Sequence, residues 1–140
     1  MYDKTITVFN YHKKSGKWFP TVISNVNLLV NDSRSLTSNG INNANSTEII
    51  VNCLPDKTIN RKKYLSPKQF AKCDEPDRYI TFTPESDFFY DGAWEDNGDI
   101  VDDDYDEGFY HAMNDEYDEV HMITYATFFS LLPHFEIGGK

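Results

Sequence analysis

Acidic side chains at alternate positions are the pattern in this sequence that comes closest to a metal site. Asp102, Asp104 and Asp106 have the spacing of the first ligands in an EF-hand loop. The same loop needs glycine at its sixth position and glutamate at its twelfth, where this chain has Glu107 and Met113. We therefore expect no calcium site. A carboxylate pair for glycoside hydrolysis stays open, because any two of so many acids can pair, but abundance alone is not evidence.

The cysteines and histidines are too scattered to indicate a zinc site or a nucleophile. Cys53 and Cys73 have no Cys-x-x-Cys partner and are expected to stay reduced and unpaired. His111 and His121 can approach each other, but satisfied or solvent-facing histidines are the simpler interpretation. The chain also lacks a Gly-rich phosphate loop, Gly-x-Ser-x-Gly and His-Glu-x-x-His. We therefore predict no catalytic residues, no metal, no cofactor and no enzymatic activity.

One short stretch, residues 57–72, has the clustered positive charge that phosphate contacts require. A solvated loop or a surface that faces another protein explains the same cluster more simply. The sequence thus predicts an interface without sequence-specific DNA binding. The candidate basic interface consists of Arg61, Lys62, Lys63 and Lys68.

Charge is divided unevenly along the chain. Residues 1–78 carry twelve Lys or Arg against seven Asp or Glu, whereas residues 79–140 carry sixteen acids and one base, which returns the net charge of −10. Faces of opposite sign would favour head-to-tail stacking of copies, and a solvated acidic surface that maintains solubility is the alternative. The candidate acidic interface or lumen surface consists of Asp102, Asp103, Asp104, Asp106 and Glu107.

The elements that must position these side chains are mostly short strands. β-branched and aromatic residues predict strands over 3–12, 18–30, 47–53, 78–83, 88–90, 118–129 and 131–137. An apolar stripe of Tyr105, Phe109, Met113 and Tyr117 predicts one amphipathic helix over 105–117. Ser66 and Pro67 predict a helical turn over 66–71. We expect a single, mainly β (α+β) domain over 1–140, a small barrel or sandwich of six to seven strands.

The segment 32–46 is rich in Ser and Asn and poor in apolar residues. A polar loop of this length in a compact domain is either functional or disordered. The chain has no run of 18 apolar residues, so we expect no membrane span. Its alternating N-terminus does not resemble a signal peptide.

Several stretches together resemble an uncharacterised family of minor structural proteins from the head-and-connector gene clusters of tailed phages. The likeness is good at both ends of the chain and weak between residues 32 and 72. The stretches are residues 1–10, Trp18-Phe19-Pro20-Thr21-Val22, Ile80-Thr81-Phe82-Thr83, Asp87-Phe88-Phe89, Gly92-x-Trp94, Asp102-Asp103-Asp104-Tyr105, Gly108-Phe109-Tyr110, Met113-Asn114 and Pro133-His134-Phe135-Glu136-Ile137.

The size and β-rich layout are similar to head-closure (stopper) and tail-joining proteins. That resemblance implies a cyclic homo-oligomer, six- or twelve-fold, between connector or adaptor and tail proteins, with DNA passing through its centre. It also implies a virion protein assembled in the bacterial cytoplasm. Two alternatives stay open: a minor capsid or other virion protein, and an acidic DNA mimic that inhibits a host nucleic-acid-binding protein. By analogy with stoppers, the candidate channel loop consists of Ser35, Ser38, Asn39, Gly40, Asn42 and Asn43.

Overall fold

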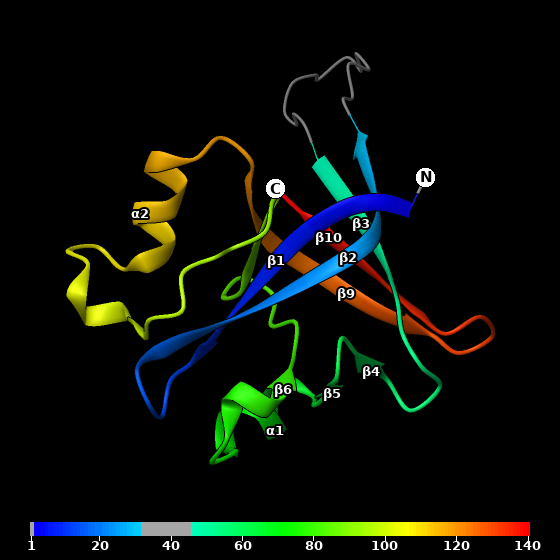
Figure 1. Cartoon of the computed structure of the whole chain (residues 1–140), viewed down its shortest axis with the longest axis horizontal. Helices are drawn as coiled ribbons and strands as arrows, with labels where there is room; N and C mark the ends of the chain where they lie inside the picture. The colour runs from blue at the N-terminus through cyan, green and yellow to red at the C-terminus, as the bar shows by residue number, and fades with distance from the viewer. Residues whose placement is uncertain (1, 32–45) are drawn as a thin grey trace, which may run out of the picture.

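A closed barrel of six antiparallel strands dominates the computed structural model, which describes residues 2–31 and 46–140 (Figure 1). Its order is β1-β7-β9-β10-β3-β2, and β2 closes the barrel by pairing with β1. A further strand, β8, pairs with the start of β2. The predicted barrel is therefore confirmed. The strands are β1 (Tyr2–His12), β2 (Lys17–Asn31), β3 (Ser46–Asn52), β7 (Phe88–Tyr90), β8 (Ile100–Val101), β9 (Val120–Phe129) and β10 (His134–Gly139).

The long strand β2 pairs with different strands along its length. It pairs with β8 at Lys17–Trp18 and with β3 over Asn27–Asn31. Asn25 lies between these pairings with a φ of 59°, a left-handed conformation that asparagine tolerates well. Between Trp18 and Asn27, no described strand pairs with β2 on the side away from β1, so this part of β2 has an open edge.

A small second sheet lies at one end of the barrel (Figure 1). The sequence predicted only a basic connection for residues 55–63, but the chain forms a tight hairpin there and continues into a parallel partner. The predicted helical turn is confirmed as α1, whose Ser66 and Gln69 form a capping box. The elements of this end sheet are β4 (Thr58–Ile59), β5 (Lys62–Tyr64), α1 (Pro67–Lys72), a 3-10 turn (Pro76–Arg78) and β6 (Tyr79–Ile80).

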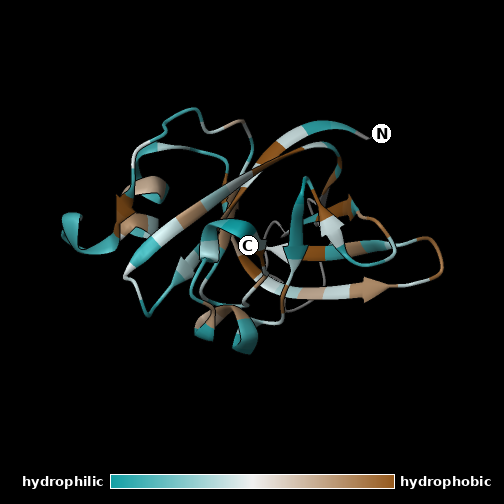
Figure 2. Ribbon diagram, turned by 60° about the horizontal axis from the view of Figure 1, so that its bottom comes forward, coloured by the Kyte–Doolittle hydropathy of each residue, from teal (hydrophilic) through white to brown (hydrophobic). Residues whose placement is uncertain are grey.

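The barrel interior is filled with apolar side chains from all six strands. Alternation along β1 directs Ile6 and Val8 inward, and Phe89 of β7 joins them. Residues from the end sheet and the segment after it complete this core, so the barrel has a packed interior. Figure 2 shows hydrophobic stretches, in brown, alternating with hydrophilic ones along the ribbon. The barrel core consists of Ile6, Val8, Ile23, Val26, Ile49, Val51, Ile59, Ile80, Phe82, Phe89, Ile123, Phe135 and Ile137.

A second, aromatic cluster packs against the outer face of β1 and β7. There the rings of Phe9 and Phe88 stack at 4.8 Å, and Phe109 of helix α2 covers them. We call this cluster, with α2 and the segment that leads to it, the outer lobe. Its buried residues are Phe9, Trp18, Phe88, Ile100, Phe109, Met113 and Val120.

Some predicted boundaries were wrong. Helix α2 spans Phe109–Glu116, because the preceding acids form a separate 3-10 turn (Asp102–Asp104) and Gly108 breaks the chain direction with a φ of 93°. The strand predicted over 78–83 ends at Ile80. The last strand begins only at His134, and Gly138 and Gly139, expected as a tail, belong to it. No described helix is long and apolar enough to cross a membrane.

Candidate functional site

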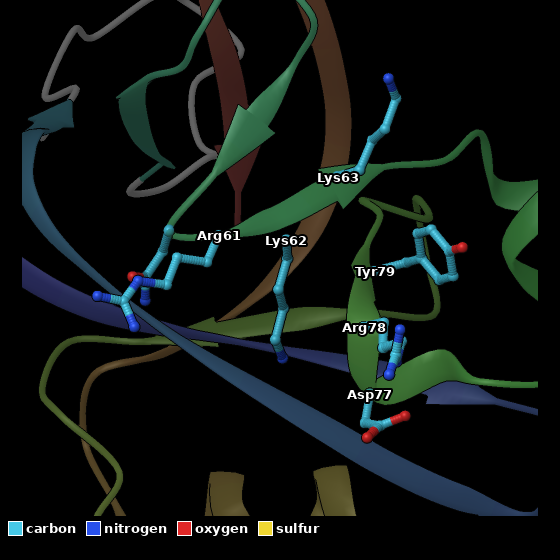
Figure 3. A pocket seen from close by; sticks show the side chains of 7 residues that line it. Arg61, Lys62, Lys63, Asp77, Arg78 and Tyr79 are labelled. Carbon is cyan, nitrogen blue, oxygen red and sulfur yellow. The ribbon is translucent and has the colours of Figure 1, made fainter.

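Three of the four predicted basic interface residues meet in one open cavity beside the end sheet. The cavity has a volume of about 530 Å³, and Figure 3 shows its side chains. Lys68 is exposed on α1 and does not line it. The lining residues are Asn60, Arg61, Lys62, Lys63, Asp77, Arg78 and Tyr79.

Lys62 is a structural residue and not a free surface charge. Its ammonium Nζ donates to the Pro20 carbonyl at 3.2 Å and to the Thr21 hydroxyl at 2.9 Å. Burial lowers the pKa of this ammonium. Asn60 donates in the same way to the Val22 carbonyl. The two side chains therefore satisfy carbonyls on the open edge of β2 and attach the β4–β5 hairpin to the barrel.

The cavity's remaining cations are exposed. Arg61 and Lys63 diverge from Lys62 in Figure 3, and both are open to solvent. Arg78 is paired with Glu75 at 3.1 Å. The freely presented charge of this surface therefore comes mainly from Arg61 and Lys63.

Among the predicted acidic residues, Asp102 has a structural role. Its Oδ1 accepts the indole N–H of Trp18 at 2.8 Å and the backbone N–H of Phe109, the first residue of α2, at 2.9 Å. Its own backbone N–H donates to the Gly16 carbonyl at 3.0 Å. Gly108 lets the chain pass close to this carboxylate, because a Cβ there would lie 3.3 Å from Oδ1. The half-buried carboxylate of Asp102 thus joins α2 to β2, and its backbone N–H attaches the same residue to the β1–β2 turn.

The other four predicted acids, Asp103, Asp104, Asp106 and Glu107, are exposed. Asp106 and Glu107 line a cavity of about 290 Å³ together with His111. The imidazole of His111 lies 3.4 Å from Glu107 and 3.2 Å from Asp115. Within residues 2–31 and 46–140, no group of three or more His, Cys, Asp or Glu is arranged to hold a metal ion.

A third cavity, which sequence reasoning missed, combines aromatic rings with carboxylates. We call this cavity, of about 310 Å³, the socket. The signal available in the sequence was the run Ala93-Trp94-Glu95-Asp96, an aromatic residue directly before two acids. The lining residues are Tyr90, Ala93, Trp94, Glu95, Asp96 and Tyr117.

The socket is positioned by the outer face of the barrel. The Thr7 hydroxyl on β1 donates to the Gly92 carbonyl at 2.8 Å and accepts the Trp94 backbone N–H at 3.0 Å. The Trp94 ring lies edge-on to Phe9, 5.3 Å away. Tyr90, at the end of β7, meets Tyr117, which follows α2, at 5.1 Å. Aromatic rings from three segments therefore meet below two exposed carboxylates.

Asp87 is a second feature that the sequence did not single out. It is fully buried, and its carboxylate accepts N–H groups from Asn10, Tyr11 and Thr83, each at 2.9 Å. Burial raises its pKa to about 6, against the opposing effect of these hydrogen bonds. Asp87 therefore ties β1 to the segment between β6 and β7, inside the molecule and away from the three cavities.

The cysteines are free in the structure, as the sequence predicted. Burial raises the pKa of both thiols. The predicted channel loop, which includes Ser35, Asn39 and Asn43, lies outside the described residues. The strands on either side of it, β2 and β3, pair up to Asn31 and Ser46.

A family model matches the whole chain, residues 1–140, and its description is "Family of unknown function (DUF6751)". No curated protein matches the chain, and no solved structure matches it. The chain therefore belongs to the family of unknown function DUF6751.

Proposed function

We propose that this protein is a non-catalytic structural subunit of a tailed-phage particle, which forms part of a cyclic ring between the head and the tail. The proposal begins from the likeness of the sequence to phage head-and-connector proteins. The proposal also places the protein in the virion, assembled in the bacterial cytoplasm, in contact with neighbouring connector, adaptor and tail proteins.

One observation of the structure supports assembly in particular. The freely presented cations, Arg61 and Lys63, lie on the end sheet, whereas the acids Asp103, Asp104 and Asp106 lie on the outer lobe (Figure 1). A cyclic ring uses heterologous contacts, in which each copy offers one surface to one neighbour and a different surface to the other. Separate surfaces of opposite sign suit this arrangement, because they attract in one orientation and repel in the others.

The packed barrel supports a scaffold role. Among the residues that the structure describes, side chains from every barrel strand pack together in its interior, as in a small barrel filled by its own core. The three surface cavities are open, and their polar groups are mainly charges suited to contacts with other proteins. DNA would pass through the centre of a ring of barrels and not through a barrel.

The test is to delete the gene from its phage and to locate a tagged copy in complemented particles by electron microscopy. We expect deletion to yield separate heads and tails, and the tag to appear at the neck with cyclic symmetry. A tag on the capsid shell would instead favour a minor capsid protein. Absence from particles, together with capture of a basic host nucleic-acid-binding protein, would favour the DNA mimic and overturn the proposal.

A further inference from the structure

We propose that Arg61 of one copy inserts into the socket of the neighbouring copy and so forms the contact that repeats around the assembly. This inference rests on the proposed ring and names the side chains that join its subunits. Arg61 stands in the turn of the β4–β5 hairpin (Figure 3). The socket is lined by residues of the outer lobe and of the segment between β7 and β8.

Arg61 occupies a backbone position that a glycine would fill more easily. The hairpin pairs Thr58 with Lys63, and its two central residues, Asn60 and Arg61, have φ values of 48° and 69°. This is the type I′ geometry, for which Asn followed by Gly is the preferred pair. An arginine at the second place adopts a left-handed conformation that is unfavourable for a side chain with a Cβ.

Within the described part of the molecule, no side-chain interaction of Arg61 offsets the cost of this backbone conformation. Two other charged residues with positive φ have partners: the ammonium of Lys57 lies 4.6 Å from the ring centre of Phe128, and Glu85 pairs with Lys140 at 3.2 Å. Arg61 is exposed and makes no hydrogen bond or ion pair with any described residue. An unfavourable backbone position without a local benefit points to a role outside the monomer.

The socket has the chemistry that binds a guanidinium group. A cation is attracted to the faces of tryptophan and tyrosine rings, and arginine also stacks on them through its planar group. Trp94 supplies one such ring, while Glu95 and Asp96 at the rim are exposed carboxylates that can accept its N–H groups. Neither carboxylate is paired with a Lys or Arg among the residues that the structure describes.

All six residues that line the socket lie within residues 79–139, a stretch that contains no Lys or Arg. Arg61 lines a different cavity, which shares no residue with the socket, and we therefore assign the contact to two copies. Of the other cations of the end sheet, Lys62 is bonded to Pro20 and Thr21, and Arg78 is paired with Glu75. Lys63 is also exposed, but it lies within β5, whereas Arg61 is an exposed arginine in the turn of the hairpin.

Arg61→Gly is the first test, because it relieves the left-handed position and leaves the fold intact. We expect the variant to melt at a higher temperature than the wild type and yet to incorporate into particles at least tenfold less well. The control is Lys68→Ala, which removes an exposed cation from α1 without placing a glycine in the helix. This control should incorporate into particles normally. Normal incorporation of Arg61→Gly would overturn the inference.

A covalent trap then distinguishes this inference from the proposed function. Phage particles are prepared with a chain that carries Arg61→Cys and Glu95→Cys in a Cys53→Ser, Cys73→Ser background, and are mildly oxidised. We expect a ladder of disulfide-linked oligomers on a non-reducing gel, and a single band when either new cysteine is absent. A single band from particles that contain the chain would overturn the docking of Arg61 and leave the ring standing. Absence of the wild-type chain from particles would overturn both.

Discussion

The two apolar clusters share β1 and β7 as a common wall but are held together in different ways. The barrel core is mostly aliphatic and receives side chains from six strands joined by continuous pairing. The outer lobe is mostly aromatic and is attached through ring contacts, the short pairing of β8 with β2 and the hydrogen bonds of Asp102. Val8 faces the first cluster and its neighbour Phe9 faces the second. The comparison teaches that one pair of strands can carry a cooperative scaffold on one face and a separable module on the other.

The largest expected effect comes from opening a cavity in each cluster in turn. Phe89→Ala in the barrel core should lower the free energy of unfolding by about 3–5 kcal/mol, and the whole chain should lose cooperativity. For Phe109→Ala in the outer lobe, we expect a loss of free energy of unfolding at the lower end of that range, because α2 can detach while the barrel stays folded. Chemical denaturation with hydrogen exchange checks this. Equal loss of exchange protection in both regions after Phe109→Ala would show that the lobe is not separable.

The buried carboxyl of Asp87 gives the scaffold a pH dependence. Because its pKa is raised from 3.8 to about 6, the folded state binds a proton more tightly than the unfolded state does. The stabilisation is complete below about pH 4 and is lost as the pH rises through 6, by about 3 kcal/mol.

Denaturation from pH 4 to pH 7 measures this dependence, with Asp87→Asn as the comparison. The amide cannot titrate, so the difference in free energy of unfolding between the two proteins should change across that window. The amide should also be less stable throughout, because its NH₂ group faces N–H donors. A difference that stays constant with pH would show that Asp87 keeps its charge when folded.

Asp102 tests how the lobe is attached. Asp102→Ala leaves the Trp18 indole and the first turn of α2 without their acceptor, at a cost of about 1–3 kcal/mol. We expect faster hydrogen exchange in α2 and almost unchanged exchange in β9 and β10. Asp103→Ala, which removes an exposed neighbouring acid, should stay within about 0.5 kcal/mol of the wild type. If Asp102→Ala and Asp103→Ala changed the free energy of unfolding equally, Asp102 would not be the residue that attaches α2 to β2.

The smallest effect concerns the barrel's outer surface. Tyr125 lies flat over Gly138, donates to Glu48, and has its pKa raised to about 12, first by that hydrogen bond. Gly138→Ala would place a Cβ 2.1 Å from the tyrosine ring and push it into solvent, at about 1 kcal/mol. Ultraviolet titration should then show the Tyr125 pKa moving down towards 10. Gly98→Ala, where a Cβ meets only ordinary contacts, is the control.

Sequence reasoning predicted what local pattern determines. β-branched residues marked the strand that contains Ile6 and Val8, and Ser66 with Pro67 marked the start of α1. It missed the β4–β5 hairpin because the turn residues, Asn60 and Arg61, lack the glycine that normally marks such a turn. It extended α2 too far because an apolar stripe does not show where Gly108 redirects the chain.

The candidate sites were harder to predict, because their partners are distant in sequence. Nothing local shows that Lys62 bonds to Pro20 or that Asp102 bonds to Trp18, so both were interpreted as surface charges. The socket likewise needs Tyr90, Trp94 and Tyr117 from three segments. Charge division along the chain was visible, but which charges remain free depends on the tertiary structure.

The open edge of β2 has a mechanical consequence. On the side of β2 away from β1, no described strand pairs with the stretch between Trp18 and Asn27, and the side chains of Asn60 and Lys62 bond to its carbonyls instead. Under mechanical load we expect this attachment to break early, because a few side-chain hydrogen bonds carry the force there. Pulling on the two ends of β2 should therefore detach the β4–β5 hairpin before β1 and β2 separate.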